Sequence, residues 1–212
     1  MAIELLNTML DAVNLCLRAI GREPVASIDT ADLDAATAKD SIDQISIDLQ
    51  SKNGGWWFNR EANWKLQPNT STGFVTVPNN TLSLLEARCQ FYDQGNRLAV
   101  RGGKIYDTDN HTYDLRSITD RNGYVTCTLV LALSYEELPP QARSAVAWKA
   151  RRLFGNDTVG DVRQNERDYE REVMAMQELE RSETRNQRYN YLRDNADVNY
   201  RINRLTGGYR RY

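Results

Sequence analysis

Hydrophobic positions in the first 53 residues recur every three or four residues, which is the spacing of an amphipathic helix. The first series predicts a helix that ends before Gly21 and Pro24. Its apolar positions are Leu5, Leu6, Met9, Leu10, Val13, Leu17 and Ile20. The second series predicts a helix that starts near the cap candidates Asp29 and Thr30 and stops before Asn53. Its apolar face is formed by Ala38, Ile42, Ile45 and Leu49. Together the two series predict an αα-hairpin.

The pattern changes between Trp56 and Leu133, where short β-type runs alternate with turn clusters. The predicted strands are 64–66, 74–77, 82–86, 90–92, 97–101, 104–106 and 124–133. Gly102 and Gly103 lie between two alternating runs and predict a two-residue hairpin turn, since both positions can adopt positive φ. So many short strands in so short a segment favour a small antiparallel sandwich or barrel.

Helical spacing returns after Pro139 and Pro140. We predict one helix that breaks at Gly155 and Asn156, followed by a long helix over 157–185. The predicted buried positions of the long helix are Val159, Val162, Tyr169, Val173, Met176 and Leu179. The sequence therefore predicts an α+β protein, in which a helical bundle of N- and C-terminal helices carries an inserted β domain and an extended C-terminal arm. The predicted boundaries are 1–55 and 136–186 for the helical domain, 56–135 for the β domain and 187–212 for the arm.

The predicted arm, residues 187–212, has six arginines, five tyrosines and few aliphatic residues. At the helical angle of about 100° per residue, its apolar side chains fall within a stripe of roughly 60°. These side chains are Tyr191, Val198, Ile202 and Leu205. So narrow a stripe is suited to a groove on another surface, and tyrosine and arginine are common interface hot spots. The composition alone is equally typical of a disordered basic tail.

Charge is distributed unevenly along the chain although its net value is −2. The segment Asp29–Asp48 has six aspartates and one lysine, whereas the last 26 residues have a net charge of +4. This asymmetry suits head-to-tail or layered contacts between subunits. Since no apolar run approaches the roughly 20 residues that span a bilayer and the N-terminus lacks a basic signal region, we expect no membrane contact and synthesis in a cytoplasm.

Motifs for catalysis, metal binding or cofactor binding are not found in the sequence. His111 is the only histidine, and no pair of cysteines has metal-ligand spacing. We expect Cys16 and Cys127 to be small buried residues, because both lie in apolar runs. We therefore predict no catalytic, cofactor or metal site, although the carboxylate pairs Glu136/Glu137 and Asp107/Asp109 have the residue types that glycoside hydrolysis needs.

The most specific string in the chain is Gly54-Gly55-Trp56-Trp57-Phe58. Its glycines end a helix, and its aromatic residues begin the first extended segment. We predict that Trp56, Trp57 and Phe58 pack where the helical and β domains join, since adjacent strand residues point to opposite faces. The alternative is a platform of two indoles that stacks against sugars.

Four segments, taken in order, resemble the tail tubular protein A family, the head–tail adaptors (gatekeepers) of short-tailed bacteriophages, the podoviruses. They are AIGREPV at 19–25, the helix from Ile45 through QS into GWWFN at 55–59, the hairpin LAVRGGKIYD at 98–107, and YEELP at 135–139 leading into an alanine-rich helix. The resemblance extends over residues 5–180. The match is weakest beyond Arg185, where arginine, tyrosine and asparagine dominate.

The resemblance implies a structural virion protein without enzymatic activity. It implies a ring of twelve subunits that joins the portal to a tail nozzle of the tail tubular protein B type, with tail fibres docked near the lower junction. Genomic DNA would pass through the ring during ejection without sequence-specific binding. The protein would be made and assembled in the host cytoplasm and would end in the virion tail at the portal vertex.

These implications assign roles to three regions of the chain. The long helix from Asp157 is expected between ring neighbours, and Arg101, Lys104 and Tyr106 are expected to face the nozzle and fibres. Portal contact is assigned to Tyr189, Tyr191, Arg193, Val198, Tyr200, Arg201, Ile202, Arg204 and Leu205. Two alternatives stay open: a carbohydrate hydrolase acting on host-surface polysaccharide, and a nucleic-acid-binding protein that uses the Arg/Tyr tail for phosphate contact and base stacking.

Overall fold

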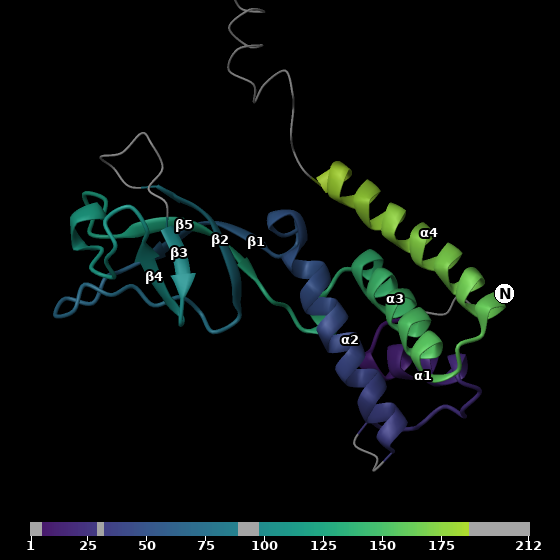
Figure 1. Ribbon diagram of the computed structural model, residues 1–212. Coiled ribbons are helices and arrows are strands. Elements are labelled where there is room, and N and C mark those ends of the chain that lie inside the picture. The colour runs from purple at the N-terminus through teal and green to yellow at the C-terminus, as the bar shows by residue number, and fades with distance from the viewer. Residues whose placement is uncertain (1–5, 29–31, 89–97, 187–212) are drawn as a thin grey trace, which may run out of the picture.

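The computed structural model describes residues 6–28, 32–88 and 98–186 and combines helices at one end with strands at the other (Figure 1). The helices are α1 (Met9–Ala19), α2 (Leu33–Ser51), α3 (Pro140–Thr158) and α4 (Val162–Asn186). The strands are β1 (Arg60–Leu66), β2 (Thr81–Arg88), β3 (Leu98–Arg101), β4 (Lys104–Asp107) and β5 (Val125–Leu131). Short 3₁₀ turns lie at Lys52–Gly54, Arg116–Ile118 and Tyr135–Glu137. The predicted α+β class is confirmed.

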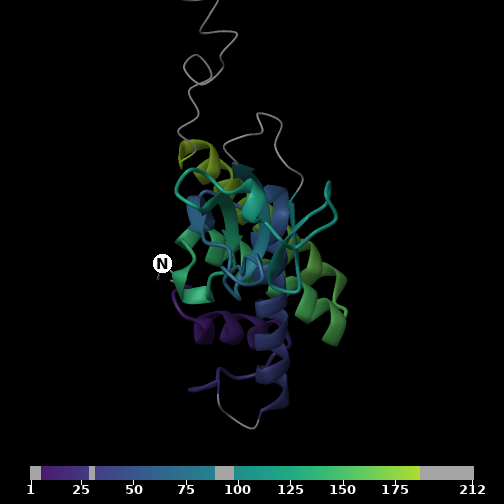
Figure 2. The same cartoon turned by 90° about the vertical axis from the view of Figure 1, so that its left-hand side faces the viewer.

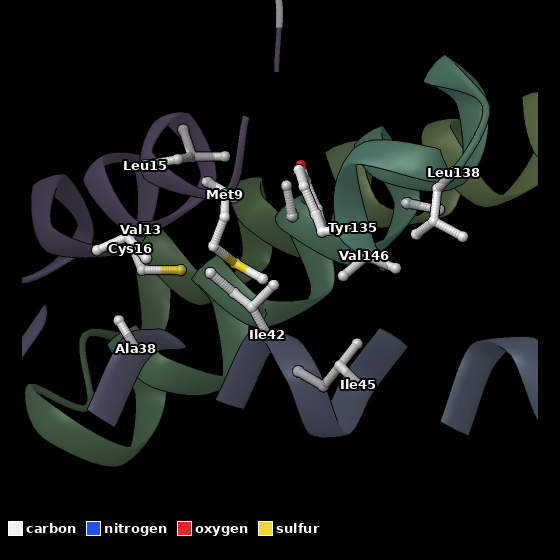
Figure 3. Close-up of a cluster of buried hydrophobic side chains, with 14 of the residues drawn as sticks. Met9, Val13, Leu15, Cys16, Ala38, Ile42, Ile45, Tyr135, Leu138 and Val146 are labelled. Atoms are coloured by element: carbon white, nitrogen blue, oxygen red, sulfur yellow. The ribbon is translucent and has the colours of Figure 1, made fainter. Parts of the chain in front are cut away.

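Helices α1, α2 and α3 pack around one hydrophobic core. Figure 3 shows Met9 and Cys16 of α1 facing Ala38 and Ile42 of α2. In Figure 2 the strand-bearing end faces the viewer, and α1 is seen to cross α2. The start of α1 is fixed by a capping box, in which Thr8 and Asp11 satisfy each other's backbone N–H groups.

The start of α2 differs from the prediction. The N-cap is Asp32, whose carboxylate accepts hydrogen bonds from the backbone N–H groups of Asp34 (2.9 Å) and Ala35 (3.4 Å). Asp29 and Thr30 lie outside the described residues. Asp32 also pairs with Arg22 (2.8 Å), so the cap is tied to the turn that follows α1. Several aspartates in this segment have the same local cap signal, and the contact with Arg22 distinguishes Asp32 from the others.

The predicted helix break at Gly155 and Asn156 is wrong. Helix α3 continues through Gly155 to Thr158, and the break lies at Gly160, which has a φ of +71°. Gly155 is buried, and a Cβ on it would lie 3.2 Å from Cβ of Ala19, so this glycine lets α3 approach the end of α1. Asp161 then accepts hydrogen bonds from the backbone N–H groups of the first turn of α4, which begins the next helix.

Part of the predicted buried edge of α4 is exposed. Val159, Val162 and Tyr169 have exposed fractions of 57%, 68% and 55%. The buried positions of α4 are Asp168, Leu179 and Ser182, and Val173 and Met176 are partly buried. The contact face is rotated because α4 packs against α3 through a buried ion pair as well as through apolar side chains. An exposed apolar strip is left on α4.

The strands form two small antiparallel sheets, β1-β5-β2 and the hairpin β3-β4. The hairpin turn at Gly102 (φ +56°) and Gly103 (φ +72°) is confirmed. The run 74–77 is not a separate strand, because it makes one isolated bridge, between Thr76 and Lys104. The run 90–92 lies outside the described residues. The buried side chains of this second core are Val75, Val77, Ile105, Leu115, Ile118, Val125, Cys127, Leu129 and Leu131.

Two buried amide side chains connect the helices to the three-stranded sheet. Gln50, at the end of α2, bonds to both backbone groups of Leu133. Asn59 donates to the carbonyl oxygens of Gln50 and Leu131 (both 3.1 Å) and accepts from the backbone N–H of Trp56 (2.7 Å). Because both amides are 1% exposed, these bonds are shielded from water and fix how the strands leave the helical body.

Candidate interaction sites

The aromatic string that follows α2 lies between the helices and the first strand. Trp56 is 4% exposed within the helical core, and its indole N–H donates to the carbonyl oxygen of Leu49 (2.7 Å). Trp57 is 36% exposed, and its backbone N–H donates to the carboxylate of Glu183 on α4 (2.8 Å). Phe58 stacks with Trp56 and meets Trp57 edge-on. A sugar platform of two indoles is wrong, because Trp56 offers no exposed ring face.

Gly55 permits this arrangement. Its φ is +80°, and a Cβ at this position would lie 2.7 Å from Cγ1 of Val130 on β5. The backbone of the string can therefore approach the sheet only because residue 55 has no side chain.

A surface cluster of two cations and three aromatic rings covers the β3–β4 hairpin. We call Phe74, Arg101, Lys104, Tyr106 and Tyr113 the hairpin cluster. The Arg101 guanidinium lies 4.1 Å from the centre of the Tyr106 ring, and the Lys104 ammonium lies 4.7 Å from that of Phe74. Tyr113 contacts the other two rings, with centroids 4.8 Å from Tyr106 and 5.8 Å from Phe74. The cluster borders a hollow with a volume of ≈ 330 Å³.

The hairpin cluster contains the three residues that the sequence assigned to the nozzle and fibre side, and it adds two more. Phe74 and Tyr113 come from loops on either side of the hairpin and were missed in the sequence. Contacts of this kind hold the cations over ring faces, which preorganises both for binding. The cluster is therefore suited to contact with another protein surface.

A second hollow, which we call the arginine pocket, lies where α1, α3 and α4 meet. It has a volume of ≈ 350 Å³ and is lined by Leu15, Arg18, Trp148, Arg151, Gln164, Arg167, Asp168 and Arg171. Arg151 donates to the carboxylate of Asp168 (3.0 Å) and to the carbonyl oxygen of Leu15 (2.9 Å). The Arg171 guanidinium lies 4.7 Å from the centre of the Trp148 indole. The sequence did not indicate this pocket, because its arginines come from three helices.

The residues predicted to contact the portal, from Tyr189 to Leu205, lie outside the described residues. Their assignment stays a prediction. The preceding helix α4 is described as far as Asn186, and it ends with an internal hydrogen bond from the Asn186 side chain to the carbonyl oxygen of Ser182 (2.8 Å).

The carboxylates considered for hydrolysis bind backbone groups of turns and helix ends. Burial raises the pKa of Asp107, but hydrogen bonds from Asn110 and from the backbone N–H of Asp109 outweigh it, so the pKa lies below its ordinary value. Hydrogen bonds from the backbone and hydroxyl of Ser134 lower the pKa of Glu137. A glycosidase acid needs a raised pKa, so neither residue has the property of that acid.

The remaining chemistry of the described residues is sparse. Cys16 and Cys127 are free and buried, as predicted, and burial raises their pKa values to about 12 and about 11. His111 is exposed in a loop. Within residues 6–28, 32–88 and 98–186, no group of three or more potential ligands is placed to hold a metal ion. None of the described helices has the length and hydropathy to cross a bilayer.

Comparisons with known proteins agree with the sequence resemblance. The sequence model of the family described as "Tail tubular protein" matches residues 10–189. The chain is also 31% identical over 188 residues to Tail tubular protein A of Klebsiella phage KP34, an alignment that covers 85% of this chain and 89% of that relative. The family match includes the hairpin cluster, the arginine pocket and both hydrophobic cores except Met9. The chain therefore belongs to the tail tubular protein family, a family of phage tail structural proteins.

Proposed function

We propose that this protein is the ring-forming head–tail adaptor of a short-tailed phage. It joins the portal to the tail nozzle, helps to dock tail fibres and forms part of the conduit through which DNA is ejected. The observation that carries this proposal is the family match over residues 10–189, which spans almost the whole described structure. In this role twelve copies form the ring, and genomic DNA passes through it without sequence-specific binding.

Two separate parts of the chain are assigned to two different partners. The hairpin cluster lies in the strand-bearing end, whereas α4 ends beside the junction of helices and strands, where Glu183 accepts a hydrogen bond from the backbone N–H of Trp57 (Figure 1). We assign the arm to the portal, with Tyr191, Arg201 and Leu205 among its contacts. We assign Arg101, Lys104 and Tyr106 to the nozzle and fibres, because their cations are held over aromatic rings at the surface and arginine and tyrosine are typical of interface hot spots.

The helical part supports contacts between ring neighbours. Val162 and Tyr169 expose apolar surface on α4 that no described residue covers, which is the kind of surface that a subunit interface buries. The two separate hydrophobic cores support the division into a helical domain, 1–55 with 136–186, and a β domain, 56–135. Trp56 and Phe58 belong to the helical side of that junction.

The proposal is tested by electron microscopy of the purified protein, alone and mixed with its portal. We expect a new ring of density on the tail-facing end of the portal. The portal alone is the control for its own density. A protein that stays monomeric and never adds a ring to the portal would contradict the adaptor function.

A further inference from the structure

The arginine pocket has an excess of positive charge among the residues that line it. Its lining contains four arginines and one carboxylate, that of Asp168, which is already engaged by Arg151. The two arginines that matter here are Arg167 and Arg171, both on α4. Among the described residues, neither Arg167 nor Arg171 forms an ion pair with a carboxylate. Like charges held together in a hollow repel one another and favour the binding of a carboxylate-bearing partner.

The exposed face of α2 has the complementary character. Asp40 and Asp48 are exposed on it, and neither pairs with a described cation. Ile47 lies on the same face with 49% of its surface exposed. The opposite face of α2 is buried against α1 and α3, so the helix is held rigidly while it presents these side chains. An apolar side chain bordered by unpaired carboxylates fits a basic hollow with an aromatic floor.

The pocket and the acidic face of α2 are separate surfaces of the same chain. No residue of α2 lines the pocket, and α3 lies between α2 and α4 (Figure 1). Two complementary surfaces at different places on one subunit give a head-to-tail contact, which closes into a ring when its rotation permits. A second copy therefore provides the matching surface.

We propose that the arginine pocket of each subunit receives the exposed face of α2 from the next copy in the ring. Asp40 and Asp48 of one subunit pair with Arg167 and Arg171 of its neighbour, and Ile47 packs toward Trp148. This inference rests on the proposed ring and identifies the surfaces that build it. Guanidinium–carboxylate pairs would fix the register of neighbouring subunits, because their geometry is directional.

Charge reversal in two separate variants tests the pairing. One variant carries Arg167→Glu and Arg171→Glu, and the other carries Asp40→Lys and Asp48→Lys. Each variant alone places like charges across every interface. We therefore expect the protein concentration at which half of the subunits are assembled to rise roughly tenfold, or assembly to be lost. In a ring that alternates the two variants every interface again has opposite charges, so we expect an equimolar mixture to assemble as the unmodified protein does. Assembly is measured by sedimentation velocity and by electron microscopy of rings on the portal.

Control variants separate this effect from folding and from general charge. Arg163→Glu on α4 and Glu61→Lys on β1 change the same charges at exposed positions outside both surfaces. We expect both controls to assemble like the unmodified protein, and all variants to keep its circular dichroism spectrum and melting temperature. If the charge-reversed arginine variant does not fold, it is replaced by the milder variant with Arg167→Gln and Arg171→Gln, for which we still expect weakened assembly.

The outcomes distinguish this inference from the proposed function. Rings that form normally from each charge-reversed variant, or a mixture that stays dissociated, would overturn the pairing and leave the adaptor function intact. Arginine variants that form rings with one another but lose portal or DNA binding would assign the pocket to that partner and overturn the inference. An unmodified protein that associates neither alone nor on the portal would overturn both proposals.

Discussion

The side-chain amide of Gln50 forms two hydrogen bonds with the backbone of one residue, Leu133. The Leu133 N–H donates to Oε1 (2.8 Å), and Nε2 donates to the Leu133 carbonyl oxygen (3.0 Å). Gln50 lies in the last turn of α2, and Leu133 follows β5, so one buried amide joins the helical body to the strand that returns from the β region. A mutation here should disturb the connection between the two hydrophobic cores.

Gln50→Leu keeps the volume of the side chain and removes both bonds. Because the N–H and C=O groups of Leu133 would lose their partner in a partly buried place, we expect a loss of about 2–4 kcal/mol in the free energy of unfolding. Urea denaturation followed by circular dichroism measures the change. Gln177→Leu, at an exposed position on α4, is the matched control and should change stability by about 0.5 kcal/mol or less. Equal effects of the two substitutions would contradict a special role for Gln50.

The ion pair between Arg151 and Asp168 joins α3 to α4, and its side chains are 16% and 8% exposed. Asp168→Ala leaves the arginine without its carboxylate in a nearly buried position, so we expect destabilisation of about 3–5 kcal/mol. Glu178→Ala removes the partner of Arg185 from an exposed pair and should cost about 1 kcal/mol or less. Thermal and urea unfolding of the two variants would show whether burial makes this difference, and a similar small loss in both would refute it.

Local signals predicted much of the fold. The hairpin at Gly102 and Gly103 depends on neighbours in sequence, and so do the apolar stripes of α1 and α2. Gly155 was misread because a glycine signals a helix end in sequence, whereas its role depends on contact with Ala19, far away in the chain. The exposure of Tyr169 has a related cause, since periodicity marks an apolar stripe without showing which element covers it.

The interaction sites were harder to predict for the same reason. The hairpin supplied Arg101 and Tyr106 close together in sequence, but Tyr113 completes the cluster from a loop. The arginine pocket combines α1, α3 and α4, so its arginines look like ordinary solvated helix residues when the sequence is read locally. Only packing brings Arg171 over Trp148 and makes a concentrated positive surface.

The buried thiols predict a loss of stability at high pH. Both thiols ionise near the ordinary value of 9.0 in the unfolded chain, but burial raises the pKa to about 12 for Cys16 and about 11 for Cys127. The folded state therefore keeps the thiol protons to higher pH than the unfolded chain does. The stability that the protonated thiols contribute is complete below the unfolded-state pKa and is lost as the pH rises toward the pKa values of the folded state. We expect a slope of up to about 1.4 kcal/mol per pH unit for each thiol.

Cys16→Ala isolates the larger of these contributions. The variant should show a shallower decline of unfolding free energy between about pH 9 and about pH 11 than the unmodified protein. Tyr135, whose pKa is raised mainly by burial, is present in both proteins, so its contribution cancels from the difference except for the minor part of its shift that comes from Cys16. Urea titrations across this range measure the two slopes, and identical slopes would show that Cys16 does not contribute.

The hairpin cluster predicts selective loss of one partner. Arg101→Ala together with Tyr106→Ala removes a cation and the ring beneath it from the surface. We expect attachment of the nozzle or fibres to weaken roughly tenfold or more, because such side chains are typical hot spots. Ring assembly on the portal should be unchanged. Pull-down of nozzle and fibre proteins by preformed portal–ring complexes measures this, with Arg121→Ala in an exposed loop as the control.

We expect removal of the C-terminal arm to abolish attachment to the portal rather than attachment to the nozzle and fibres. A chain that ends after Arg185 keeps every member of both hydrophobic cores, including Leu179 on α4, so we expect its melting temperature to change by no more than about 4 °C. It should nevertheless fail to attach to the portal, because the Tyr/Arg-rich contacts of 187–212 are missing. Attachment of the full chain should weaken with salt, because arginines paired with acidic portal surface are screened. Full-strength docking by the shortened chain would instead place portal contact within the described structure, where the exposed apolar strip at Val162 and Tyr169 is the next surface to mutate.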